Sequence, residues 1–214
     1  MTILNLSSGS RNSRYLKFFT FISLVFYLPV ILILIGIIPY QYRYHLLIVM
    51  TFLIVILVVY SHFSWKELGF RLDTLQGSLT WNGVLSLLFL ALLLIAYFSG
   101  LLRSPHIPGN DTLSAIAFIS FYILISGPCQ EFIYRSFIFA LMERAGISEM
   151  IPKLVISAIT YCFLHIIYRD LITLIVTLFM GLVWGYIYYK KPNFWGVMIS
   201  HSVLGAVAII VGLI

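Results

Sequence analysis

The chain has 214 residues, of which 62% are hydrophobic and 9% are charged, and its formal net charge is +6. Its mean hydropathy of +1.06 is far above that of a water-soluble domain. Apolar runs of about 18 residues or more recur to the end of the chain, a pattern typical of membrane-spanning helices. The basic residues are spread through short loops, which indicates membrane topology and no nucleic-acid partner. We therefore expect an all-α, polytopic helix bundle in a lipid bilayer.

The apolar runs predict about seven transmembrane helices. Their coarse bounds are Leu16–Ile38, Leu46–Phe63, Asn82–Leu102, Thr112–Met142, Ile151–Tyr168, Leu171–Tyr189 and Phe194–Ile214. The fourth run is too long for one simple span, and we expect Gly127-Pro128 to break or kink it, because proline removes a backbone donor and clashes one turn back. Residues 65–81 are expected to form an interfacial link, and residues 103–111 a turn-rich loop.

The basic residues also predict an orientation. With the N-terminus in the cytoplasm, three arginines (Arg43, Arg103 and Arg169) fall outside, and nine basic residues fall inside: Arg11, Arg14, Lys17, Lys66, Arg71, Arg144, Lys153, Lys190 and Lys191. Short cytoplasmic loops carry an excess of Lys and Arg. We therefore expect a multi-pass protein of the cell membrane with a cytoplasmic N-terminus and an outside C-terminus.

Two ionisable residues, Glu131 and Arg135, interrupt the fourth apolar run. Charged side chains at membrane depth are costly, and they commonly mark a functional site that faces the bundle interior. Residues four apart share one face of a helix and can pair. One interpretation is an ion pair that only orients helices. The other makes Glu131 a general base or a metal ligand, with Arg135 holding the geometry of the site.

Two histidines, His165 and His201, lie in later apolar runs. From the rise of a helix, Glu131 and His165 lie about 18 Å, and His201 about 10 Å, from the cytoplasmic ends of their spans. These depths are compatible with convergence on one site. Taken alone, His165 is more often a hydrogen-bonded core or interface residue than a ligand, and His201 is ambiguous. Together with Glu131 they match a catalytic zinc site with one open position, or they polarise water without a metal.

Other features have simpler interpretations. Cys129 and Cys162 lie in apolar segments, which excludes a disulfide framework, and we interpret Cys129 as a small hydrophobe and not a nucleophile. Gly181 and Gly185 form a Gly-x-x-x-Gly pattern that favours close helix packing, within the chain or between two copies. An interfacial aromatic belt around the Lys190-Lys-Pro-Asn193 turn is predicted from Trp184, Tyr186, Tyr188, Tyr189 and Trp195.

Three motifs in this order resemble those of a known family. They are Gln130-Glu131 with Arg135, Tyr161-x-x-x-His165, and His201 followed four residues later by Gly205. The pattern resembles the CAAX prenyl protease and bacteriocin-processing (CPBP/Abi) family of intramembrane metalloproteases. The resemblance implies N-terminal membrane helices and a link over residues 1–111, and a protease core over residues 112–208. It also implies a site in the membrane that opens toward the cytoplasm.

Two positions depart from that family's motifs. Gln130 stands where the family has the first of two glutamates, the one thought to activate water, and an amide cannot serve as a general base. Glu131 cannot simply replace it, because neighbouring residues of a helix point about 100° apart. Gly205 stands where the family has an asparagine or aspartate thought to orient or stabilise the reacting oxygen.

The resemblance and the residues together leave three functions open. The first, which we favour, is a bacterial intramembrane endopeptidase that hydrolyses a membrane-associated peptide. Glu131 would activate water, and His165 and His201 would bind a divalent metal such as zinc or polarise the water. Gln130 and Arg135 would orient the substrate or the carboxylate. The second is a non-catalytic protein of the same fold, acting in bacteriocin self-immunity or in binding a membrane partner. The third, an ion-coupled transporter, is disfavoured because the chain lacks two similar halves.

Overall fold

The computed structural model describes residues 9–100 and 112–213, and within those ranges it contains helices and turns and no strand. Its α-helices are α1 (Arg11–Ile22), α2 (Leu28–Leu34), α3 (Arg43–Tyr60), α4 (Leu75–Phe98), α5 (Thr112–Phe121), α6 (Gly127–Glu131), α7 (Ile138–Ala145), α8 (Met150–Leu164), α9 (Leu171–Lys190) and α10 (Phe194–Ile210). Six continuous helical stretches in the described ranges are long and apolar enough to cross a membrane, and α10 is a shorter apolar helix. The predicted all-α, multi-pass bundle of about seven helices is confirmed.

The sequence predicts a break or a kink at Gly127-Pro128, and the structure has no break there: the fourth apolar run is one continuous helical stretch, Thr112–Ala145. The backbone remains helical at Ser126, with φ −64° and ψ −50°. It widens instead into π-helical turns at Tyr122–Ser126 and Phe132–Phe137, on either side of α6. A π turn shifts the hydrogen-bond ladder where proline cannot donate, so the helix continues through Pro128.

Helix α4 begins at Leu75, seven residues before the predicted Asn82, and the interfacial link is correspondingly shorter than residues 65–81. Ser78 and Asn82 are buried, and Ser78 lies against Gly196 of α10, where a Cβ atom would overlap it. Polar residues that look interfacial in the sequence thus belong to a contact between two helices. The loop predicted at residues 103–111 lies outside the described residues.

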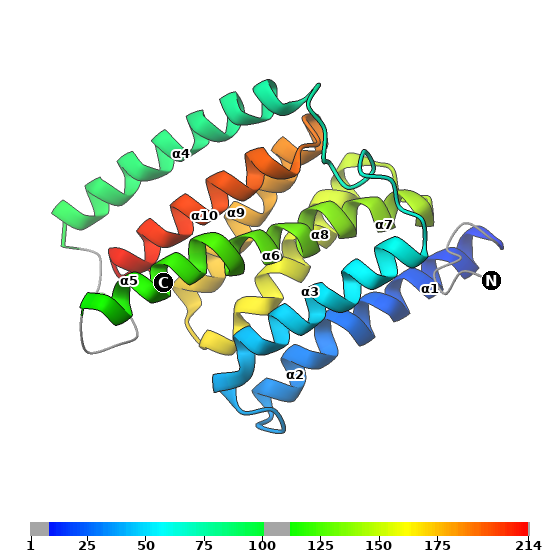
Figure 1. The fold of residues 1–214 in the computed structure, drawn as a ribbon, viewed down its shortest axis with the longest axis horizontal. Helices are drawn as coiled ribbons and strands as arrows, with labels where there is room; N and C mark the ends of the chain where they lie inside the picture. The colour runs from blue at the N-terminus through cyan, green and yellow to red at the C-terminus, as the bar shows by residue number, and fades with distance from the viewer. Residues whose placement is uncertain (1–8, 101–111, 214) are drawn as a thin grey trace.

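Helix α10 lies between α4 and the long α5–α7 stretch, while α8 and α9 pack together behind it (Figure 1). The α8–α9 contact depends on Gly181, where a Cβ atom would lie 3.1 Å from the Cα atom of Ala158. Gly185 likewise faces Leu154 at 3.2 Å. The Gly-x-x-x-Gly pattern therefore serves packing within this chain.

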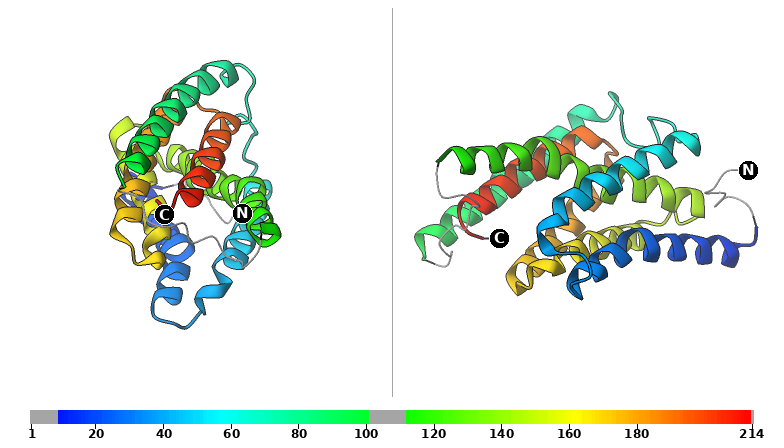
Figure 2. Two further views of the ribbon diagram at one scale, coloured as in Figure 1. Left: turned by 90° about the vertical axis from the view of Figure 1, so that its left-hand side faces the viewer. Right: turned by 60° about the horizontal axis from the view of Figure 1, so that its bottom comes forward.

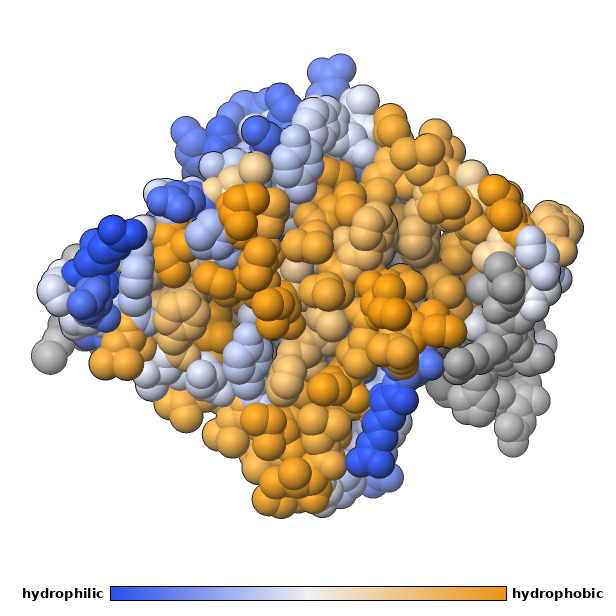
Figure 3. Space-filling model, turned by 180° about the vertical axis from the view of Figure 1, so that it is seen from behind, coloured by the Kyte–Doolittle hydropathy of each residue, from blue (hydrophilic) through white to orange (hydrophobic). Residues whose placement is uncertain are grey.

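The turns at one end of the bundle are joined by polar contacts. The Arg144 guanidinium, at the end of α7, donates hydrogen bonds to the carbonyl oxygens of Ser61 and His62 at 2.7 and 2.9 Å. It also pairs with Glu67 at 3.1 Å. The start of α1 lies at this same end, away from the C-terminus (Figure 2). Hydrophilic side chains gather mainly toward this end, and apolar side chains cover most of the remaining face seen in Figure 3.

Candidate functional site

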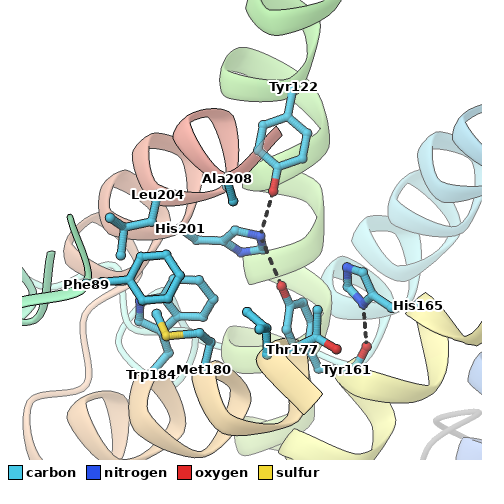
Figure 4. A pocket seen from close by; sticks show the side chains of 12 residues that line it. Phe89, Tyr122, Tyr161, His165, Thr177, Met180, Trp184, His201, Leu204 and Ala208 are labelled. Carbon is cyan, nitrogen blue, oxygen red and sulfur yellow. Dashed lines mark hydrogen bonds between the residues drawn. The ribbon is translucent and has the colours of Figure 1, made fainter. Parts of the chain in front are cut away.

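Glu131 of α6 and His201 of α10 meet inside the bundle. The Oε1 atom of Glu131 lies 2.7 Å from Nδ1 of His201, and the two residues are 0% and 1% exposed. The other ring nitrogen, Nε2, lies 3.2 Å from the hydroxyl of Tyr122 and 3.2 Å from the hydroxyl of Tyr161 (Figure 4). An ionised Glu131 accepts a hydrogen bond from Nδ1–H, which leaves Nε2 free to accept protons.

A glycine on α6 allows this meeting. A Cβ atom at Gly127 would lie 3.3 Å from the Cα atom of Ser202, so the backbones of α6 and α10 approach closely at this point. Glu131 lies one turn beyond Gly127 and His201 directly before Ser202. The close approach of the two helices therefore brings a short carboxylate side chain within hydrogen-bond distance of the imidazole.

Arg135 holds the second oxygen of the carboxylate. Its Nε atom lies 3.6 Å from Oε2 of Glu131, and both side chains are fully buried. Its Nη1 atom donates to the carbonyl oxygen of Tyr134 and to Oγ of Ser157, each at 3.2 Å. Its Cζ atom lies 4.8 Å from the centre of the Tyr161 ring, within the range of a cation–π contact. Arg135 thus balances the charge of Glu131 and also holds the Tyr161 ring beside the ion pair.

Trp184 of α9 covers one face of His201. The two rings are stacked with centres 4.7 Å apart, and the indole Nε1–H donates to Oγ of Ser200 at 3.1 Å. Trp184 is 3% exposed and Tyr188 is also buried, so the predicted interfacial belt is wrong for these two residues. Trp195, at 42% exposure, lies at the surface as a belt residue should. Aromatic residues near a loop can therefore be core residues, and the sequence does not separate the two kinds.

A cavity of about 30 Å³ adjoins this cluster, enough for one or two water molecules. Tyr122, Tyr161, His165, Thr177 and His201 are its polar lining residues, and apolar residues that include Phe89 of α4 close it on other sides (Figure 4). The polar wall supplies the hydrogen-bonding partners that a buried water needs. The site therefore combines a buried carboxylate–imidazole pair with space for a small reactant.

The remaining predicted site residues lie nearby with other partners. His165 lines the same cavity, but its Nδ1 atom lies 3.0 Å from the carbonyl oxygen of Tyr161. The Gln130 amide nitrogen donates to Oγ of Ser126, one turn back, at 3.0 Å. The structure thus brings Glu131 into hydrogen-bond contact with His201. His165 lies next to the Tyr161 ring, and Gln130 is hydrogen-bonded to a residue of its own helical stretch.

The side chains present do not fit a divalent metal ion. Across residues 9–100 and 112–213, no group of three or more His, Cys, Asp or Glu side chains is placed to hold one. Both ring nitrogens of His201 have protein partners, and Nδ1 of His165 is directed at a backbone carbonyl. The zinc ion considered from the sequence stays a prediction, and the chemistry below uses protein groups alone.

The sequence alone does not identify Tyr122 as a site residue, and it places Trp184 in the interfacial belt. It includes Tyr161 only as the aromatic member of a motif. Tyr122 and Tyr161 direct their hydroxyls at His201, and Trp184 stacks on its ring. Aromatic residues are common in apolar runs, so their sequence signal is weak. A tyrosine hydroxyl buried in a membrane helix needs a hydrogen-bond partner. That requirement is the feature by which Tyr122 and Tyr161 could be recognised as candidates in the sequence.

Residues 112–207 match the protein family described as Type II CAAX prenyl endopeptidase Rce1-like. This range contains Tyr122, Glu131, Tyr161 and His201. Comparisons with curated proteins and with solved structures found no match. The resemblance noted from the motifs is confirmed over residues 112–207, and the match supports a CAAX-type intramembrane protease fold for this part of the chain.

Proposed function

We propose that this protein is an intramembrane endopeptidase in which His201 is the general base and Glu131 orients it. The observation that carries the proposal is the buried hydrogen bond between Glu131 and His201, with Nε2 on the wall of a water-sized cavity. The family matched by residues 112–207 supports a peptidase. It also supports a prenylated, membrane-associated peptide as the substrate class.

The roles follow from which atoms reach the cavity. Glu131 is fully buried behind His201, so it acts on water through the imidazole and not directly. The carboxylate holds the tautomer with hydrogen on Nδ1 and stabilises the imidazolium that forms, as in other carboxylate–histidine pairs of hydrolases. Nε2 takes a proton from a water molecule, whose oxygen attacks the peptide carbonyl, and later returns it to the leaving amine.

Three further residues support this chemistry. Arg135 stabilises the ionised form of Glu131 and, through its contact with the Tyr161 ring, keeps that hydroxyl beside Nε2. His165 forms part of the polar wall, where it is placed to hydrogen-bond the attacking water or the peptide. Gln130 maintains the local helix through Ser126.

We also propose that the N-terminus is cytoplasmic. Four segments expected inside meet at one end of the bundle: the start of α1, residues 61–74, the α7–α8 turn and the α9–α10 turn. Arg14 lies beside Gly146, and Arg144 donates to Ser61. Their basic residues support a cytoplasmic location for that end. In a cysteine-free background, membrane-impermeant maleimide should label Tyr40→Cys in intact cells and Lys66→Cys only after permeabilisation; the reverse would overturn this orientation.

The test of the peptidase uses the full chain in liposomes with a fluorophore–quencher peptide that ends in a farnesylated Cys-aliphatic-aliphatic-X sequence. His201→Gln keeps a donor toward Glu131 and an acceptor toward the tyrosines but cannot take up a proton. We expect it to lower kcat by about 10²- to 10⁴-fold, the usual contribution of a general base. The matched control is His45→Gln, at the start of α3, which should cleave at the wild-type rate.

A second function is favoured by Gln130 and Gly205, which depart from the family's motifs. It is a non-catalytic protein that binds a membrane peptide. Purified wild-type protein that binds the farnesylated, geranylgeranylated or unprenylated probe but cleaves none of them would refute the peptidase and support this second function. Cleavage that survives His201→Gln would refute His201 as the base.

A further inference from the structure

Tyr122 fills the space beside Gly205, one turn after His201 on α10. A Cβ atom at Gly205 would overlap the Tyr122 hydroxyl and would lie 2.6 Å from its Cζ atom. Both residues line the cavity beside His201. With Tyr122 in this position, there is no room for a side chain at position 205, and the chain has glycine there.

The Tyr122 hydroxyl is directed into the site. It is buried, it lies 3.2 Å from Nε2 of His201, and it approaches from the helix opposite α10 (Figure 4). Tyr161 reaches the same nitrogen but carries two other tasks, since Arg135 lies over its ring and its carbonyl oxygen faces His165. Of the two hydroxyls, that of Tyr122 is the one that also lies against Gly205 on the cavity wall.

We propose that Tyr122 is a catalytic residue that donates a hydrogen bond to the carbonyl oxygen of the scissile peptide. This inference rests on the proposed peptidase function. A preorganised hydroxyl donor in a buried site with little water stabilises a developing oxyanion far more than the same group does in water. The tyrosine supplies the donor that Gly205 cannot.

The step balances as follows. The water oxygen bonds to the carbonyl carbon while Nε2 of His201 takes the water proton, and the C=O π pair moves onto the carbonyl oxygen. The Tyr122 O–H donates its hydrogen bond to that oxygen and keeps its proton. When the pair returns, the C–N bond breaks, and the imidazolium gives its proton to the leaving nitrogen. His201 and Tyr122 then have their starting protonation.

The first test is Tyr122→Phe, measured in liposomes with the farnesylated fluorophore–quencher peptide. Loss of one oxyanion donor should lower kcat by about 10²- to 10³-fold with KM nearly unchanged. The matched control is Tyr186→Phe on α9, an exposed tyrosine that should keep the wild-type kcat. A wild-type kcat in Tyr122→Phe, alongside an inactive His201→Gln, would overturn the role of Tyr122 and leave the peptidase standing.

The second test moves the hydrogen-bond donor from position 122 to position 205. It separates loss of the donor from a loss of activity caused by misfolding. Gly205→Asn alone should unfold at a lower temperature, because the new side chain overlaps Tyr122. Tyr122→Ala alone should lack the donor. The double variant Tyr122→Ala/Gly205→Asn removes the overlap and supplies an amide donor, so we expect its kcat to exceed that of Tyr122→Ala by at least about 10-fold. A double variant that folds like the wild type but is no more active than Tyr122→Ala would overturn the proposal.

Discussion

The imidazole of His201 lies against the indole of Trp184, with ring centres 4.7 Å apart and an angle of 21° between the planes. This stacking sets the plane of the imidazole. In that plane Nδ1 meets the carboxylate of Glu131, and Nε2 meets the two tyrosine hydroxyls. The orientation of His201, the proposed base, therefore depends on a residue for which no contact with the Glu131 carboxylate is seen.

Trp184→Leu should lower kcat by about 10²-fold, since misplacement of a catalytic group by 1 Å has an effect of that size. Trp184 covers that face of His201, so we expect the substrate not to contact it and KM to change little. Steady-state cleavage of the farnesylated peptide in liposomes measures both constants. Trp195→Leu, at an exposed position, is the control and should retain the wild-type kcat. An unchanged kcat in Trp184→Leu would contradict this role of the stacking.

Glu131→Gln should destabilise the protein by about 3–5 kcal/mol, because it leaves the fully buried Arg135 without its counter-charge. Thermal unfolding in detergent measures the change. The double variant Glu131→Gln/Arg135→Met should unfold closer to the wild-type temperature, since it removes both charges. Asp73→Asn, in an exposed ion pair with Arg71, should have a much smaller effect. Equal destabilisation by the single and double variants would show that the charge balance is not what matters.

Gly181→Leu should separate α8 from α9 and destabilise the fold by about 1–3 kcal/mol, the usual effect of overpacking a close contact. Activity should fall as well, because α8 carries Tyr161 and α9 carries Trp184. The matched control is Gly83→Leu on α4, where a Cβ atom would meet nothing within 4 Å. Thermal unfolding and peptide cleavage are measured for both. A stable and active Gly181→Leu protein would refute the close-packing role.

The stability of the link between α3 and α4 should depend on pH through Glu67. Burial alone would raise the pKa of the Glu67 carboxyl, but hydrogen bonds from Arg144 and Ser64 outweigh it, and the pKa is lowered. A lowered pKa means that the stabilisation is present above the unfolded value of about 4.3 and is lost as the pH falls through the folded value. The difference in unfolding temperature between wild type and Glu67→Gln should therefore be largest near neutral pH and should vanish in acid. A difference independent of pH would contradict the assignment.

The sequence by itself determined the features that depend on one-dimensional spacing. Apolar run lengths predicted the multi-pass all-α bundle, since a span needs a certain number of residues. The four-residue spacing predicted that Glu131 and Arg135 pair, and Nε of Arg135 lies 3.6 Å from Oε2 of Glu131. Motif order predicted the family matched by residues 112–207. These properties follow from the chain alone. In a regular helix, the number of residues sets the length of a span, and the spacing of two residues sets whether they lie on the same face.

Only the tertiary structure decided which side chains meet. Nine residues, about two and a half turns of regular helix, separate Tyr122 from Glu131, which predicts opposite faces. The π turn at Tyr122–Ser126 alters that register, and both residues contact His201. The approach of α6 to α10 at Gly127 likewise depends on how two distant helices pack. Local spacing carries no information about such contacts, because they arise from the balance of packing across the whole bundle.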